Sequence, residues 1–300
     1  MAAMALLTAC SAPPAANGQT LTQARAGHET RVAARMDTND PVQVPPARVL
    51  RIVSYPAAPG PLAAYVTPPP ADGQRHPAII WMTGGDTSTI GDVWSPADPA
   101  NDQSARAFRE AGIVMMYPSL RGGNRNPGEH EGNYGEVQDV LAAVDWLAAQ
   151  DYVDPQRIYL GGHSTGGTLV LLTSEMSSRF RAVFSFGPVS TLDNGYARHL
   201  GVAFNNQREL DLRSPGLWLG SIARPTFVFE GAEQGNGGEL QDMAGRSTNP
   251  AARFFLIEGA DHFSVLGPTT GLIARKILTD TGAEPNLTFT QEELDSLFSR

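Results

Sequence analysis

A serine between two glycines is the residue of this chain best suited to chemistry. The run Gly162-His163-Ser164-Thr165-Gly166 directly follows an apolar stretch that ends at Leu160. A Gly-x-Ser-x-Gly run between a strand and a helix forms a sharp turn that exposes the serine hydroxyl as a nucleophile. The flanking glycines permit this turn because they lack side chains. The sequence therefore predicts acyl transfer through a covalent intermediate on Ser164.

A serine nucleophile needs a base, and His262 is the best placed of the six histidines. It follows the last expected strand, residues 254–257, and parallel strands present their carboxyl ends at one edge of a sheet. We therefore expect His262 to lie near Ser164, with a pKa near neutrality that suits a general base. We expect His163 to shape the turn instead of acting as the base.

These residues require a scaffold of alternating strands and helices, which begins near residue 48. The alternation predicts a mostly parallel, doubly wound α/β sheet flanked by helices on both faces. It also predicts a single domain over residues 48–300. The expected strands cover residues 49–53, 62–66, 78–82, 113–117, 157–160, 182–186, 226–229 and 254–257, and the main helices cover 104–111, 136–149 and 269–278.

Four segments resemble the α/β-hydrolase superfamily, and more narrowly the catalytic domain of prolyl oligopeptidases and dienelactone-hydrolase-like esterases. They are Tyr117-Pro-Ser-Leu-Arg-Gly-Gly123, Val153-Asp-Pro-Gln-Arg-Ile158, Gly162-His-Ser-Thr-Gly-Gly167 and Ala260-Asp-His262. The resemblance implies an α/β-hydrolase fold and a serine hydrolase that needs no cofactor or metal. Because fewer than fifty residues precede the first strand, we expect no β-propeller.

The resemblance also implies a carboxylate that orients the histidine, usually an Asp after the strand 226–229. In this chain Gln234 occupies that place, and a glutamine cannot stabilise an imidazolium by charge. We therefore expect Glu233 to be the acid. The alternatives are Glu230, Glu239, Asp193 or an incomplete triad.

Two backbone N–H groups are expected to hold the oxyanion of the tetrahedral intermediate. One belongs to Thr165, which follows the nucleophile and opens an apolar helix with a partial positive charge at its start. By resemblance to the family's His-Gly-Gly loop, the other belongs to Gly85 or its neighbour Asp86. Thr83 stands where the family usually has a histidine.

The first residues are typical of an exported protein. Residues 1–9 carry no charged side chain, and Leu7-Thr-Ala-Cys10 resembles a bacterial lipobox. The resemblance implies cleavage before Cys10, a lipid on its sulfur, and a periplasmic or outer-membrane location. Residues 10–47 are expected to form a flexible tether because no sustained apolar period is present in them.

A formal net charge of −9 without a dense basic run argues against nucleic acid as a partner. No residue spacing fits a metal site, and only the lipid on Cys10 would contact a membrane. Two enzyme classes remain, a hydrolase of small carboxylic esters and a serine peptidase of short peptides. The alternative is a non-catalytic or weakly active binding protein, which is suggested only by Gln234.

Overall fold

An eight-stranded sheet in the order β1-β2-β4-β3-β5-β6-β7-β8 forms the centre of the molecule. The computed structural model describes residues 18–32, 40–203 and 205–299. Strands β3 to β8 are parallel, whereas β2 is antiparallel to both β1 and β4. The expected mostly parallel α/β sheet is therefore confirmed. The strands are β1 Arg51–Ala57, β2 Gly60–Val66, β3 His76–Met82, β4 Val114–Pro118, β5 Val153–His163, β6 Val183–Phe186, β7 Thr226–Gly231 and β8 Ala252–Ile257.

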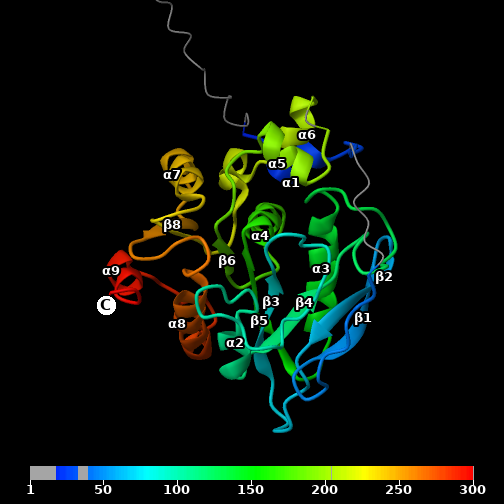
Figure 1. Ribbon diagram of the computed structural model, residues 1–300, viewed down its shortest axis with the longest axis vertical. Coiled ribbons are helices and arrows are strands. Elements are labelled where there is room, and N and C mark those ends of the chain that lie inside the picture. Colours follow the sequence, from blue (N-terminus) through cyan, green and yellow to red (C-terminus); the bar gives the residue numbers. More distant parts are fainter. Residues whose placement is uncertain (1–17, 33–39, 204, 300) are drawn as a thin grey trace, which may run out of the picture.

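Helices cover both faces of this sheet (Figure 1). On one face pack α3 (Glu136–Ala148) and α4 (Thr165–Met176), followed at the edge by α7 (Gly237–Arg246). On the other face pack α2 (Arg106–Glu110), α8 (Leu266–Thr279) and the short α9 (Gln291–Asp295). The doubly wound arrangement follows from this distribution.

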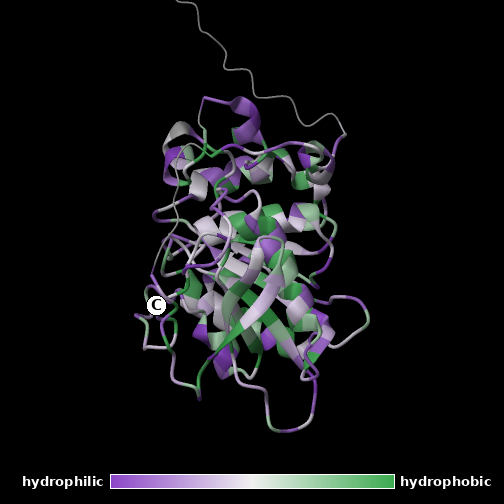
Figure 2. Cartoon of the chain, turned by 90° about the vertical axis from the view of Figure 1, so that its right-hand side faces the viewer, coloured by the Kyte–Doolittle hydropathy of each residue, from purple (hydrophilic) through white to green (hydrophobic). Residues whose placement is uncertain are grey.

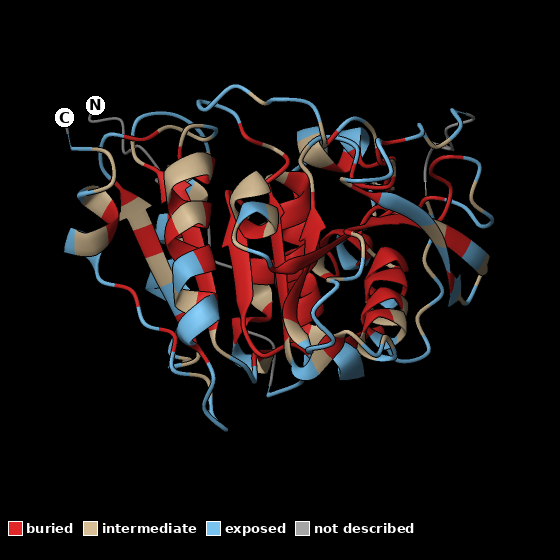
Figure 3. Ribbon diagram, turned by 90° about the horizontal axis from the view of Figure 1, so that it is seen from below, coloured by how far each residue is buried: buried red, intermediate tan, exposed pale blue. Residues whose placement is uncertain are grey.

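The central strands are apolar on both sides because each side faces a layer of helices. In β3, Ile79 and Trp81 belong to one hydrophobic cluster, whereas Ile80 and Met82 belong to the other. This alternation reflects the two-residue period of a strand. Figure 3 shows the middle of the sheet as a continuous buried layer, and Figure 2 shows hydrophobic residues concentrated there. Burying each large apolar side chain stabilises the fold by about 1.5–3 kcal/mol.

The expected elements are confirmed with shifts at their ends. The largest shift concerns β5, which is expected over residues 157–160. The strand begins earlier, at Val153, which pairs with His76 of β3. At its other end β5 continues to His163, directly before the turn. The helix expected over residues 104–111 begins only at Arg106, because Ala105 has a left-handed φ of 46°.

Residues 18–32, called the N-terminal strap below, pack against the domain. Thr20 caps α1 (Leu21–Arg25), in which the side chain of Leu21 is fully buried. The guanidinium of Arg25 donates to the carbonyl oxygens of Leu212 at 2.7 Å and Tyr134 at 2.9 Å. The prediction of a flexible tether over residues 10–47 is therefore wrong for the strap. Cys10 and the expected signal segment, residues 1–9, lie outside the described residues.

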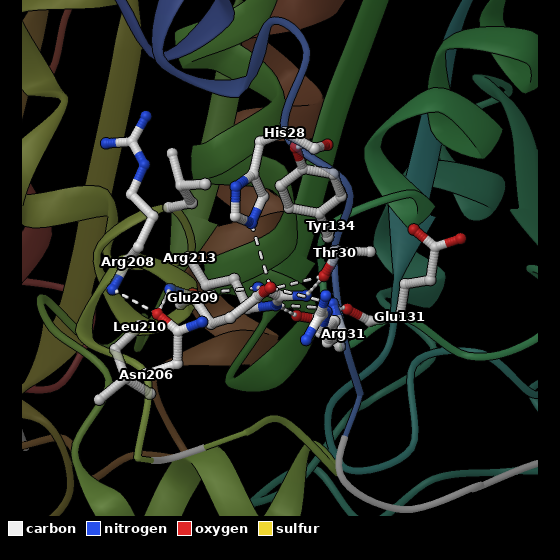
Figure 4. A network of polar contacts seen from close by, with 12 residues as sticks. His28, Thr30, Arg31, Glu131, Tyr134, Asn206, Arg208, Glu209, Leu210 and Arg213 are labelled. Atoms are coloured by element: carbon white, nitrogen blue, oxygen red, sulfur yellow. Dashed lines mark hydrogen bonds and ion pairs between the residues drawn. The ribbon is translucent and has the colours of Figure 1, made fainter.

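The strap meets two short helices, α5 (Asn194–His199) and α6 (Gln207–Asp211), at one end of the molecule (Figure 1). Their contact centres on the buried carboxylate of Glu209, which accepts from Thr30 at 2.8 Å and from Arg213 at 2.6 Å (Figure 4). His28 lies 3.0 Å from the same carboxylate. We call Glu209, Arg213 and their strap partners the strap cluster.

Among the residues that the structure describes, no helix is both long and apolar enough to span a membrane.

Candidate active site

Ser164 occupies the turn between β5 and α4. Its φ of 56° and ψ of −117° form a strained conformation that few residues other than glycine adopt. Its N–H donates to the carbonyl of Phe186 at 2.7 Å, which ties the turn to β6. A Cβ added at Gly162 or Gly166 would lie 2.7 or 2.4 Å from a backbone oxygen. The expected turn and its need for both glycines are therefore confirmed.

His262 lies in the loop between β8 and α8, at the carboxyl edge of the sheet. Its N–H donates to the carbonyl of Gln234 at 2.9 Å, which holds the loop against the segment that follows β7. Its side chain is 13% exposed, so the ring is largely enclosed but still reachable from solvent.

The imidazole of His262 packs against residues next to the nucleophile. Its ring centroid lies 4.5 Å from that of His163, the residue before Ser164. At Gly187, which follows the hydrogen-bond partner of Ser164, an added Cβ would lie 2.5 Å from Cε1 of His262. The structure thus brings the two predicted residues to the same corner of the sheet, although they are 98 residues apart in the sequence.

The carboxylate bonded to this imidazole belongs to Glu230, at the end of β7. Its Oε2 lies 2.8 Å from Nδ1 of His262, and its side chain is fully buried. The same carboxylate accepts the N–H of Gly231 at 2.8 Å and of Asn236 at 3.1 Å. Three hydrogen-bond partners fix the carboxylate in one orientation, and the carboxylate in turn orients the ring.

The prediction that Glu233 is the acid is wrong, because Glu233 does not contact His262. The side chain of Glu233 is exposed, and its N–H donates to the carbonyl of Ala260 at 3.0 Å. The sequence predicts an acid in the loop after β7, but the acid lies within the strand. A glutamate is one methylene longer than an aspartate, which helps it to reach the imidazole from there.

Asp193, Glu239 and Gln234 have structural partners of their own. Asp193 caps α5 by accepting the N–H of Tyr196 at 2.7 Å. Glu239 accepts the N–H of Ser190 at 2.7 Å. Gln234 supports His262 through its backbone carbonyl. Glu230 is thus the carboxylate that the fold brings to the histidine.

This arrangement determines which nitrogen of His262 is basic. An ionised carboxylate only accepts hydrogen bonds, so Nδ1 of His262 carries the proton that faces Glu230. In the neutral ring Nε2 then has a free lone pair and can accept a proton. The geometry of Glu230 and His262 is therefore that of an acid and base pair prepared for general-base catalysis.

His163 is a buried structural neighbour of this pair. Burial, aided by the nearby His262, lowers the pKa of His163 to about 3, so its ring is neutral. Its Nε2 donates to the carbonyl of His262 at 2.8 Å, and its Nδ1 accepts from the amide of Gln103 at 2.9 Å. Gln103 also accepts the N–H of Gly84 at 3.1 Å. Sequence reasoning missed Gln103, because no motif marks it.

The loop after β3 lies against Ser164. A Cβ added at Gly84 would be 3.2 Å from Cβ of Ser164. Because Gly84 donates to Gln103, the N–H groups of Gly85 and Asp86 are the candidates on this loop for holding an oxyanion. Gly85 has a φ of 74°, which suits glycine.

Thr165 is the first residue of α4. An N–H at this position has no acceptor within the helix, and the helix dipole favours negative charge there. Both predicted oxyanion donors therefore lie beside the turn, although their role remains a prediction. Within the described ranges, no group of three or more His, Cys, Asp or Glu side chains is arranged to hold a metal ion.

Part of the chain matches a known family. Residues 99–211 match the model of the prolyl oligopeptidase family, and this segment includes Ser164. Over 140 residues the chain is 31% identical to dipeptidyl-peptidase 5 of Porphyromonas gingivalis, which covers 44% of this chain and 20% of the relative. It is also 30% identical over 122 residues to an uncharacterised 31.7 kDa protein of Escherichia coli, covering 39% of this chain and 38% of the relative. The chain thus spans about a fifth of the peptidase.

Solved structures share the fold at low sequence identity. An esterase of Pyrobaculum calidifontis has a TM-score of 0.58 and 19% identity, covering 78% of this chain and 86% of its own. A puromycin-hydrolyzing peptidase of Mycobacterium tuberculosis has a TM-score of 0.62 and 20% identity, covering 80% of this chain and 41% of its own.

The strand order, the turn at Ser164 and these matches show that the chain has the α/β-hydrolase fold. Within that class it is similar to the prolyl oligopeptidase family, through residues 99–211.

Proposed function

We propose that the protein is a serine hydrolase that cleaves carboxylic esters or short peptides through an acyl-enzyme on Ser164. The observation that carries the proposal is the hydrogen bond of 2.8 Å between Glu230 and His262, beside a strained serine turn. A non-catalytic protein is suggested only by Gln234, and the buried carboxylate of Glu230 on the histidine argues against it. The prolyl oligopeptidase match over residues 99–211 also supports hydrolysis.

In the proposed mechanism Nε2 of His262 takes the hydroxyl proton while Oγ of Ser164 attacks the substrate carbonyl. Glu230 holds the ring and stabilises the imidazolium that forms. The N–H groups of Thr165 and Gly85 bind the oxyanion, and preorganised donors of this kind are worth about 2.7–4 kcal/mol each. His262 then protonates the leaving group, and water releases the acyl group by the same route.

The proposal is tested by replacing the nucleophile. We expect Ser164→Ala to lower kcat/KM for p-nitrophenyl acetate by about 10⁴-fold or more, because no acyl-enzyme can form. The exposed Ser178 provides a matched control, and Ser178→Ala should retain wild-type turnover. A fluorophosphonate probe should label the wild type and not Ser164→Ala. Equal labelling of both proteins, or equal turnover, would refute the nucleophile.

Ester and peptide cleavage share this chemistry and differ in the leaving group. The partial match to a dipeptidyl-peptidase favours short peptides, whereas an esterase of similar fold favours esters. Comparing kcat/KM for parallel panels of p-nitrophenyl acyl esters and aminoacyl p-nitroanilides distinguishes an esterase from a peptidase.

We further propose export with a lipid on Cys10, which is supported by the resemblance of residues 7–10 to a lipobox. Mass analysis of the mature N-terminus tests this proposal. An unmodified chain that starts at Met1 would contradict it.

A further inference from the structure

A small cavity lies beside the predicted oxyanion donors. Its volume is about 130 Å³, and it is lined by residues 85–87, His130, Thr165, His199 and Leu200. These residues come from the loop after β3, the loop after β4, the start of α4 and the end of α5. The cavity is thus walled by both oxyanion donors and by the region between β6 and β7.

The lining residues indicate which part of a substrate the cavity would hold. A leaving group must lie within hydrogen-bond reach of the histidine that protonates it. His262 does not line this cavity, whereas Gly85 and Thr165 do. The acyl part of the substrate is therefore the part that would enter it.

The cavity accepts only a short acyl group. A water molecule occupies about 30 Å³ in the liquid, so the volume corresponds to roughly four waters, or about five non-hydrogen atoms of an acyl chain.

Thr87 and His130 both line this cavity and carry side chains that can form hydrogen bonds. The hydroxyl of Thr87 is buried and has no hydrogen-bond partner in the described part of the chain, and Thr87 is only 2% exposed. His130 is also buried, and its Nδ1 contacts Ser88 at 2.8 Å and Glu136 at 3.1 Å. Since Nδ1 is already engaged, Nε2 is the ring nitrogen that remains for a ligand.

The buried carboxylate of Glu136 favours the protonated form of His130. Burial alone would lower the pKa of His130, but the hydrogen bond and charge of Glu136 outweigh it and raise the pKa above the ordinary value. A protonated imidazole donates from both nitrogens. A leftover buried donor costs about 1–3 kcal/mol, so a ligand that accepts from it gains affinity.

The surrounding charge favours a neutral acceptor over an anion. The carboxylate of Asp86 belongs to a lining residue, and Glu136 lies directly behind His130. A carboxylate on the substrate would be repelled by both of these negative groups, and the nearby positive charge of Arg213 is already paired with Glu209. A ketone or amide oxygen accepts hydrogen bonds without this repulsion.

We propose that this cavity binds the acyl part of the substrate, and that Thr87 and His130 select short acyl groups carrying a neutral hydrogen-bond acceptor. This inference rests on the proposed function of Ser164. It adds a substrate class, namely acyl groups of about five non-hydrogen atoms with a ketone or amide oxygen near their end.

Two esters of equal size test this selection. The p-nitrophenyl esters of 4-oxopentanoate and 4-methylpentanoate have the same leaving group, and a keto oxygen in one replaces a methyl in the other. We expect the wild type to prefer the keto ester about 10-fold in kcat/KM, after each value is divided by the rate of hydroxide hydrolysis. Thr87→Val should reduce this preference about threefold or more, whereas Thr87→Ser should keep it.

Thr269 supplies the matched control, because its hydroxyl is also buried without a partner but lies on α8. Thr269→Val should leave both kcat/KM values unchanged. If Thr87→Val folds poorly, Thr87→Ala provides the same comparison.

A wild type that hydrolyses both esters equally, or prefers 4-methylpentanoate, would overturn the selection while leaving the proposed function intact. A full preference retained in Thr87→Val would also overturn it. Hydrolysis of neither ester would instead count against Ser164 as a nucleophile.

Discussion

The strap cluster and the active-site corner, which consists of Ser164, His262 and Glu230, both bury ionised or ionisable groups. The two regions use these groups differently. In the strap cluster Arg213 is fully buried and donates to Glu209 and to the carbonyl of Gly132. At the active-site corner Glu230 is equally buried, yet its partner His262 keeps one ring nitrogen out of that pair.

The buried charges of the strap cluster have a structural role, whereas those of the active-site corner have a chemical role. A buried ion pair whose donors and acceptors are all bonded holds segments together, and losing one partner costs about 3–5 kcal/mol. A buried carboxylate that orients an imidazole leaves the second nitrogen free to exchange a proton. The comparison predicts that substitutions in the two regions affect different measurements.

Among the substitutions that compare the two regions, the greatest loss is expected at Glu230. Glu230→Gln keeps the shape of the side chain but removes its charge, so the imidazolium loses stabilisation and the favoured tautomer changes. We expect kcat for p-nitrophenyl acetate to fall about 10³–10⁴-fold with the fold retained. Glu233→Gln, three residues away and exposed, is the matched control and should remain within twofold of wild type. A large loss in Glu233→Gln together with an active Glu230→Gln would reverse our assignment.

The next effect concerns stability at the strap cluster. Arg213→Met leaves Glu209 buried without its cation, and we expect the free energy of unfolding in urea to fall by about 3–5 kcal/mol. Turnover per folded molecule should stay within twofold at 25 °C. Arg179→Ala removes an exposed ion pair with Asp145 and should cost less than about 1 kcal/mol. A large loss of kcat in folded Arg213→Met would mean that the two regions are coupled.

A more modest change is expected at Gln103, a positioning residue. Gln103→Leu removes the hydrogen bonds to Gly84 and His163, each worth about 1 kcal/mol. We expect kcat to fall about 10-fold while KM changes little, because the loop after β3 and His262 are placed less accurately. Gln156→Leu, at an exposed site on β5, serves as the control. A change confined to stability would assign Gln103 a purely structural role.

The smallest expected effect is the change in the free energy of unfolding that the strap cluster causes at low pH. Burial by itself would raise the pKa of Glu209, but hydrogen bonds from Arg213 and Thr30 lower it below its ordinary value of 4.5. A carboxylate whose folded pKa is lowered stabilises the fold above its unfolded pKa, and this contribution disappears as pH falls through the folded pKa.

This shift predicts a pH-dependent difference between wild type and Glu209→Gln. The variant should be less stable than the wild type at pH 7, and the gap should narrow at pH 4 and pH 3. Urea denaturation at pH 7, 5, 4 and 3 measures the gap. A constant gap across this range would show that the charge of Glu209 contributes nothing.

Much of the fold is predictable because its signals are local. Continuous apolar runs such as residues 78–82 indicate strands covered on both faces, and the helix Glu136–Ala148 is expected almost to its observed ends. Ser164 is predictable because its turn imposes glycines at fixed spacing. The strap is missed since its few apolar residues gain stability only from partners far away in the sequence, such as Leu212.

The sequence alone predicts the turn at Ser164, the histidine after the last strand and the succession of strands and helices along the chain. Three further contacts become visible only in the folded molecule: Glu230 with His262, Gln103 with both the loop after β3 and His163, and the strap with the domain. Each of them depends on side-chain reach and direction between segments distant in the chain. Spacing along the sequence does not encode such distances.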